Sequence, residues 1–91
     1  MPNPTLHVRI ISPQELILDT QALSVSSKNT DGNFDILPQH ANFITMVENS
    51  PIIVRLGKDK PLMFTFPLAI IITTQDNVNI YTYIQPSLDK K

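Results

Sequence analysis

The side chains able to do acid–base, metal or nucleophilic chemistry are few in this chain, and they are far apart. The only histidines are His7 and His40, and there is no cysteine. A zinc site needs three or four closely placed nitrogen, sulfur or carboxylate ligands, so carboxylates would have to be recruited from distant segments. We therefore expect no metal ion, and we interpret His7 as an ordinary histidine on the solvent side or at the edge of a strand.

The acidic residues and the glycines give no better support for catalysis. The acidic residues fall mainly at turns, where Asp hydrogen-bonds the backbone, and no pair stands out as a general acid and base. Gly32 and Gly57 are the only glycines, so there is no glycine-rich loop to hold a phosphate group. No serine-centred elbow or catalytic cysteine is present. The sequence predicts neither an enzyme nor a cofactor site.

The charge pattern excludes a nucleic-acid binder that works through a basic surface. The formal net charge is −1 and 16% of the residues are charged, whereas binding to phosphates rests on clustered Lys and Arg. So low a charged fraction instead suggests that partners cover part of the surface. No apolar run approaches the roughly 18 residues of a membrane span, and neither end carries a signal-peptide or lipidation motif.

Short β-strands must position these residues, because apolar and polar residues alternate along most of the chain. Alternation with a period of two predicts the first strand at residues 6–11, with Leu6, Val8 and Ile10 on one face. Further runs rich in β-branched residues follow at close, regular spacing. We predict the later strands at 22–27, 33–37, 43–47, 52–56, 62–66, 68–74 and 78–83.

One segment is ambiguous between a helix and a strand. Residues 12–15 (Ser-Pro-Gln-Glu) match a helix-capping box with proline at the first helical position. However, the apolar residues at 16–18 are contiguous and Asp19 and Thr20 follow within one turn, which is too short for a stable helix. We therefore expect a turn and a short strand here.

Turn residues separate the later runs. Asp31 and Gly32 predict a type I′ hairpin turn, Pro38 ends a strand, and Pro67 marks an edge, a bulge or a bend. So short an all-β chain buries its alternating faces most naturally as two packed sheets. We predict a single small β-sandwich domain at residues 1–85, followed by a C-terminal tail at 86–91.

The central stretch resembles a known family signature. Residues 32–41 read Gly-Asn-Phe-Asp-Ile-Leu-Pro-Gln-His-Ala, similar to the Gly-x-Leu-Gly-Ile-x-Pro-x-His-Ala signature of the epsilon subunit of rotary F-type ATP synthases (the delta subunit in mitochondria). Residues 8–13 resemble that family's opening Val-Val-Ser/Thr-Pro strand. Residues 64–80 resemble its strand pair ending in Asn-Val-x-Val. The resemblance covers about residues 6–84.

The resemblance implies a flattened β-sandwich of about ten strands in the non-catalytic central stalk (rotor). There it would link the gamma subunit to the membrane c-ring, so that ring rotation couples proton or sodium transport to ATP synthesis or hydrolysis. Gly32 and Asn33 fall where the family meets the c-ring loops, and Ser12 and His40 fall on the side that faces gamma. Asn33 also reads as a simple turn residue, and His40 as a cap of the Pro38 turn.

The resemblance also implies a location and a shape of surface. We expect peripheral attachment to the cytoplasmic face of a bacterial cell membrane through the complex, or to the inner face of a mitochondrion or plastid. We expect an exposed apolar patch beside His40 or the strand at 70–74.

Three departures from the family pattern stand out. Asp35 replaces the second glycine of the signature, and Pro67-Leu68-Ala69 replaces a Ser-Gly-Gly bend. The chain ends at Lys91, where the family's C-terminal helical hairpin should begin. If that end is natural, we expect neither the inhibition nor the nucleotide site that the hairpin supplies in some members.

A second reading is a free-standing β-sandwich module that binds carbohydrate or peptide. Such a module needs an exposed row of aromatic side chains. Tyr81 and Tyr83 are the only pair in the sequence that fits.

Overall fold

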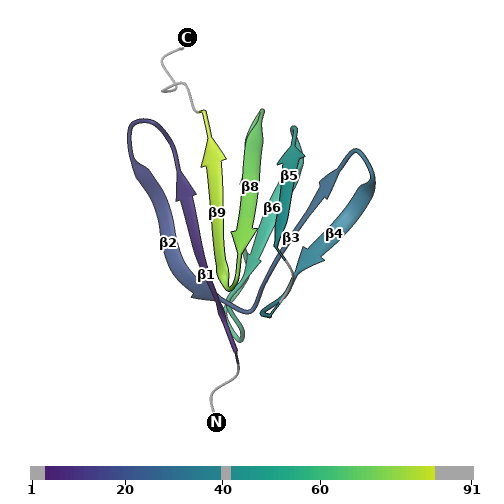
Figure 1. The fold of residues 1–91 in the computed structure, drawn as a ribbon. Helices are drawn as coiled ribbons and strands as arrows, with labels where there is room; N and C mark the ends of the chain where they lie inside the picture. Colours follow the sequence, from purple (N-terminus) through teal and green to yellow (C-terminus); the bar gives the residue numbers. More distant parts are fainter. Residues whose placement is uncertain (1–3, 40–41, 84–91) are drawn as a thin grey trace.

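Nine β-strands in two sheets form the part of the chain that the structure describes, residues 4–39 and 42–83 of a computed structural model (Figure 1). The strands are β1 (Leu6–Ile11), β2 (Leu16–Ala22), β3 (Ser24–Asn29), β4 (Gly32–Ile36), β5 (Phe43–Val47), β6 (Pro51–Arg55), β7 (Leu62–Thr65), β8 (Ala69–Thr74) and β9 (Asn77–Thr82). The predicted all-β sandwich is confirmed. Within these described ranges, the structure contains no helix that could cross a membrane.

The two sheets differ in width and in how the chain closes them. The larger sheet has the order β2-β1-β9-β8-β5, and the smaller has the order β4-β3-β6-β7. β1 pairs in parallel with β9, so the first and last described strands lie side by side in the middle of the larger sheet. Every other pairing among the described strands is antiparallel.

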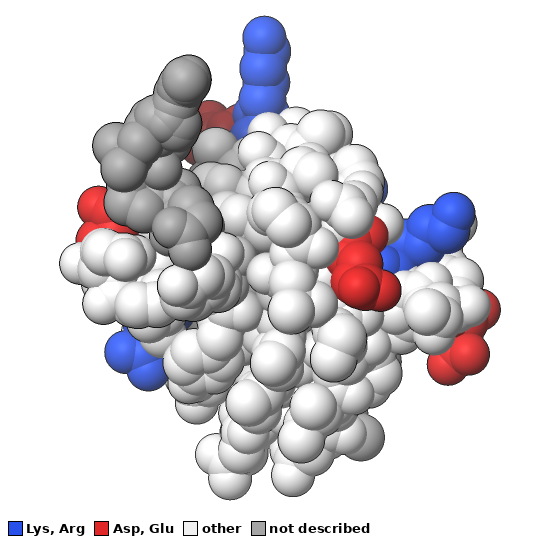
Figure 2. Space-filling view, turned by 90° about the horizontal axis from the view of Figure 1, so that it is seen from above, with Lys and Arg blue, Asp and Glu red and all other residues white. Residues whose placement is uncertain are grey.

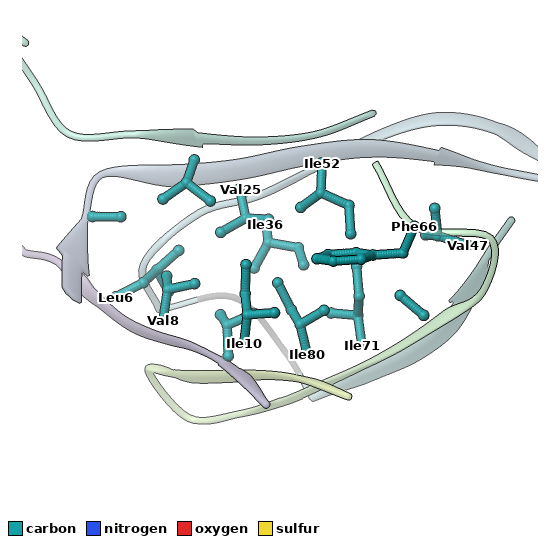
Figure 3. Packing of buried hydrophobic residues seen from close by; sticks show 14 residues of the cluster. Leu6, Val8, Ile10, Val25, Ile36, Val47, Ile52, Phe66, Ile71 and Ile80 are labelled. Atoms are coloured by element: carbon teal, nitrogen blue, oxygen red, sulfur yellow. The ribbon is translucent and has the colours of Figure 1, made fainter. Parts of the chain in front are cut away.

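The core lies between the sheets and is made of alternate residues from both. Leu6, Val8 and Ile10 of β1 are fully buried, as the alternation predicted. Figure 3 shows the aliphatic side chains of the larger sheet pointing toward those of the smaller one. The buried cluster comprises Leu6, Val8, Ile10, Ala22, Val25, Ile36, Val47, Ile52, Val54, Phe66, Ala69, Ile71, Val78 and Ile80. Each fully buried aliphatic side chain stabilises the fold by about 1.5–3 kcal/mol relative to its exposed state.

The chain passes from one sheet to the other at bends, and the sequence predicted only one of the two bends described here. Pro67 lies between β7 of the smaller sheet and β8 of the larger one, so the predicted interruption is a bend. Leu23 separates β2 from β3, and its backbone N–H donates to the carbonyl of Arg55 at 2.7 Å. The strand predicted at 22–27 therefore begins two residues later, at Ser24. β2 also continues through Asp19 to Ala22, beyond the segment predicted for it.

The hairpin between β3 and β4 is confirmed, but its predicted type I′ turn is wrong. Asn29 pairs with Gly32, which leaves Thr30 and Asp31 as the two loop residues. Neither has a positive φ, whereas Gly32 has φ +120°. A type I′ turn requires positive φ at both central residues. The glycine serves the first strand position after the turn instead.

Candidate functional site

Ser12 organises the turn between β1 and β2. Its side chain is 7% exposed. The Ser12 Oγ accepts hydrogen bonds from the backbone N–H groups of Gln14 at 3.3 Å and Glu15 at 3.1 Å, and donates to the Glu15 carbonyl at 3.2 Å. The sequence that matched a helix-capping box therefore caps a hairpin turn, and β2 begins directly after it as a strand. The Ser12 hydroxyl already donates one hydrogen bond and accepts two, so it has none left for a partner protein. Ser12 can therefore affect a partner only through the shape of the turn.

An unbroken row of five apolar side chains crosses the larger sheet on the face turned away from the core. Each of the five strands contributes one residue, and each residue is the register partner of the next. We call this set the outer apolar row: Leu16, Ile11, Tyr81, Ile70 and Met46, in sheet order. Exposed fractions are 52% for Leu16, 42% for Tyr81, 38% for Ile70 and 53% for Met46. A partner surface that lies flat on this face would bury a continuous apolar strip.

The outer apolar row widens at one edge and ends beside the Ser12 turn at the other. Ile44 is 71% exposed on β5 and pairs with Ile72 on β8, which adds a second apolar pair next to Met46 and Ile70. Ile11 immediately precedes Ser12. The expected apolar patch on the strand at 70–74 is thus confirmed. The other location named for it, beside His40, lies outside the described residues, as does any contact of His40 itself.

The flanks of the 40–41 segment are tied to the turn between β8 and β9. The backbone N–H of Gln39 donates to Asp76 Oδ1 at 2.8 Å, and the N–H of Gln75 donates to Asn42 Oδ1 at 3.2 Å. The sequence placed Asp76 among the acidic turn residues that hydrogen-bond the backbone, but it gave Asn42 no role. These bonds fix where the chain enters and leaves the segment that contains His40.

Gly32 and Asn33 lie at the start of β4, next to the tip of the β3–β4 hairpin. Asn33 is exposed and Gly32 is half-buried. The hairpin is anchored by Asn29, whose Oδ1 accepts from the Asp31 N–H at 2.8 Å and whose Nδ2 donates to Thr45 Oγ1 of the other sheet at 2.8 Å. Asn29 is a positioning residue, and it lies two positions beyond residue 27, where the sequence predicted the end of its strand.

The predicted site residues that the structure describes do not form one cluster. The turn that contains Ser12 and the hairpin that contains Gly32 and Asn33 lie at the same end of the sandwich but on opposite sides of it (Figure 1). Seen from above, this end carries its charged side chains mainly around the rim, with uncharged surface between them (Figure 2). Two separate docking regions fit this arrangement better than a single pocket does.

Acid–base chemistry finds little support in the geometry. His7 Nε2 lies 2.5 Å from Asp19 Oδ1, and both side chains are more than one third exposed. Within residues 4–39 and 42–83, no group of three or more His, Cys, Asp or Glu side chains is placed to hold a metal ion. The His7–Asp19 pair joins β1 to the edge strand β2, which agrees with the expected ordinary role of His7.

Comparison of the sequence with known proteins identifies close family matches. A family model described as the β-sandwich domain of the ATP synthase delta/epsilon chain matches residues 5–83. The ATP synthase epsilon chain of Gloeothece citriformis (strain PCC 7424) is 38% identical over 55 residues, covering 60% of this chain and 40% of that protein. ATP synthase epsilon chain 2 of Paraburkholderia xenovorans (strain LB400) is 35% identical over 54 residues, covering 58% and 37%. The aligned segments thus span about 40% of the length of these relatives.

Solved structures share the fold at much lower identity. A chain of the cryo-EM structure of Euglena gracilis mitochondrial ATP synthase (OSCP/F1/c-ring, rotational state 1) superposes with a TM-score of 0.81 at 13% identity, covering 90% of this chain and 52% of that one. A chain of the Tetrahymena thermophila mitochondrial ATP synthase central stalk/c-ring structure gives a TM-score of 0.73 at 13% identity, covering 87% and 63%. At this identity the likeness concerns the fold alone.

Proposed function

Because this chain belongs to the family of ATP synthase delta/epsilon chain β-sandwich domains, we propose that it is a non-catalytic central-stalk subunit of an F-type ATP synthase. In this role it links the gamma subunit to the membrane c-ring. Rotation of the ring, driven by proton or sodium transport, passes through the sandwich to gamma and so couples to ATP synthesis or hydrolysis. The chain is held at one face of the coupling membrane by these partners.

The observation that carries the proposal is the outer apolar row. A sheet face exposed to water normally shows polar residues, because antiparallel sheets alternate apolar-in with polar-out. Here one register line shows apolar side chains on all five strands. Contiguous exposed apolar surface marks a protein interaction site. A typical stable interface buries about 800 Å² on each partner, and a face five strands wide is broad enough to provide it.

We assign the outer apolar row to gamma because it continues into the Ser12 turn, which the family resemblance directs toward gamma. The start of β4 at Gly32 and Asn33, next to the hairpin tip, then serves the c-ring, because it belongs to the other sheet and leaves the apolar face free for gamma. Both regions are built on paired strands rather than on long loops, so force applied at one is transmitted through the packed core to the other.

The test is reconstitution with the partners of the same ATP synthase. The chain mixed with its purified gamma subunit should elute as a complex on gel filtration, and that complex should capture the detergent-solubilised c-ring. A free gamma peak and no ring capture, with all partners shown to be folded by circular dichroism, would contradict the proposal.

One observation favours the second candidate function, a module that binds carbohydrate or peptide. Tyr81 and Tyr83 are 42% and 64% exposed, so the aromatic pair needed by a carbohydrate- or peptide-binding module is accessible. Tyr81, however, lies between Ile11 and Ile70 in the outer apolar row, so its cross-strand partners offer no polar group to a sugar hydroxyl. A glycan array and a peptide array probed with the labelled chain test this reading. Binding that is lost in both Tyr81→Ala and Tyr83→Ala would favour it over the stalk role.

A further inference from the structure

A chain of hydrogen bonds crosses three strands of the smaller sheet, on the face turned away from the core. Arg55 Nη1 of β6 donates to the Oγ of Ser26 on β3 at 2.6 Å, and the same hydroxyl donates to Oδ1 of Asp35 on β4. Ser26 and Asp35 are register partners. We call these three residues the Arg55–Ser26–Asp35 relay. It joins β4 to β6, which are not neighbours in the sheet.

The relay has a defined polarity. A cationic donor lies at one end, an anionic acceptor at the other, and the hydroxyl between them accepts from the first and donates to the second. Hydrogen bonds to ionised groups are stronger than neutral ones, and bonds in such a sequence polarise one another. Ser26 is only 8% exposed, so water competes poorly at the central position even though both charged ends are exposed.

The strand held by the relay needs an anchor. β4 is an edge strand that pairs only with β3, and edge strands with one partner open more easily than central ones. Asn33 and Asp35 lie on the same outward face of β4, two residues apart. Both line a hollow of about 360 Å³ on this sheet, and Ser26 lines it as well.

We propose that Arg55, Ser26 and Asp35 are positioning residues that hold β4, and thereby fix Asn33 and the wall of this hollow, for docking of the c-ring loops. The inference rests on the proposed function, since it assigns the docking of the ring to this strand. Asp35 has an ordinary negative φ, so the position does not require the glycine of the family signature. A glycine there has no side chain to accept from Ser26. The relay is therefore a device that this chain gains from its departure at residue 35.

Amide hydrogen exchange followed by NMR on the full chain tests the anchoring step. Ser26→Ala and Asp35→Ala remove the relay and should accelerate exchange in β4 by about tenfold or more, while β9 exchange stays unchanged. Ser26→Thr keeps the hydroxyl and should return β4 exchange to within about threefold of the wild type. Asp35→Asn keeps an uncharged acceptor, should give an intermediate rate, and replaces Asp35→Ala if that variant does not fold. Equal acceleration in both strands, or none in β4, would overturn the inference.

Capture of the detergent-solubilised c-ring by the complex with gamma tests the docking step. Asp35→Ala or Asp35→Asn should weaken ring capture by about fivefold or more, with affinity for gamma unchanged within about twofold. Ser26→Thr should capture the ring as the wild type does. If the wild-type complex captures the ring and the Asp35 variants do so equally well, this inference fails and the proposed function stands. If the wild-type chain binds neither partner, the proposed function fails first.

Discussion

Ile70 on β8 lies directly opposite Tyr81 on β9, and both side chains point away from the core at the centre of the larger sheet. Their strands are central, so this pair has apolar neighbours on both sides, with Ile11 beside Tyr81 and Met46 beside Ile70. Central contacts that become fully shielded from water contribute most to an interface. Ile70 is therefore the residue through which the proposed gamma-binding face is tested most directly.

Ile70→Asp should weaken binding to gamma by at least about 2 kcal/mol, or about 30-fold, because it removes an apolar contact and leaves an unpaired charge in a dry interface. Its side chain is 38% exposed in the free chain, so the free energy of unfolding should fall by no more than about 1 kcal/mol. Isothermal titration with gamma and urea denaturation of the free chain measure the two effects.

Met63→Asp is the matched control for Ile70→Asp. Met63 is 63% exposed on β7 of the smaller sheet, so the same charge is introduced on the opposite outer face. Its affinity for gamma should equal that of the wild type. Equal losses in both variants would show that charge anywhere on the sandwich disturbs binding, and would remove the outer apolar row as the gamma site.

Ser12→Ala should lower the free energy of unfolding by about 1 kcal/mol, because the backbone N–H groups of Gln14 and Glu15 lose the acceptor that the buried Ser12 hydroxyl provides. Ser12→Thr keeps the oxygen and should lose much less. Urea denaturation checks both. If Ser12→Ala weakens gamma binding while Ser12→Thr does not, the turn acts through its shape; an unaltered stability in Ser12→Ala would contradict the geometry described for the hydroxyl.

Gly32→Ala should destabilise the chain by about 1 kcal/mol or more, because its φ of +120° is a conformation that residues with a Cβ rarely adopt. Apart from Gly32 and its two chain neighbours, no residue has a heavy atom within 4 Å of the added Cβ, so the cost comes from the backbone and not from crowding. Asn33→Ala, at an exposed neighbouring position without positive φ, is the control and should change stability by less than about 0.5 kcal/mol. Thermal denaturation of both variants distinguishes the two cases.

Local patterns predicted the strands well, because each strand buries one face. Alternation in β1 identified Leu6, Val8 and Ile10 as core, and Pro67 correctly interrupted two strands. Turn chemistry was less informative. The Asp31–Gly32 pair suited a type I′ turn, yet pairing of Asn29 with Gly32 moved the loop back by one residue. The rest of the sheet sets the register between β3 and β4. This register places Thr30 and Asp31 in the loop instead of Asp31 and Gly32.

The outer apolar row was beyond local reasoning, because its members are scattered over the chain. Tyr81 lies beside Ile11, and Ile70 beside Met46, only through pairings between distant segments, including the parallel pairing of β1 with β9. Expecting a patch on the 70–74 strand was possible, because that strand is apolar on both faces. The Arg55–Ser26–Asp35 relay was also beyond local reasoning, because its three residues lie on three different strands. The sequence marked Asp35 only as the position where the family signature has a glycine.

Thr73→Val should raise the free energy of unfolding by about 1 kcal/mol. The Thr73 side chain is 1% exposed, and its Oγ1 is buried without a hydrogen-bond partner among the described residues. A buried unpaired hydroxyl is unfavourable, and valine has nearly the same shape without that hydroxyl. Urea denaturation at constant pH measures the change.

Thr82→Val is the matched control and should have the opposite sign. Thr82 is 5% exposed and its Oγ1 donates to the Leu68 carbonyl at 3.0 Å, so valine removes a bond that is made and leaves a carbonyl with one partner fewer. We expect a loss of about 1–2 kcal/mol. Two losses of equal size would show that the Thr73 hydroxyl has a partner in solution, because a paired hydroxyl is the only state in which both substitutions remove a hydrogen bond.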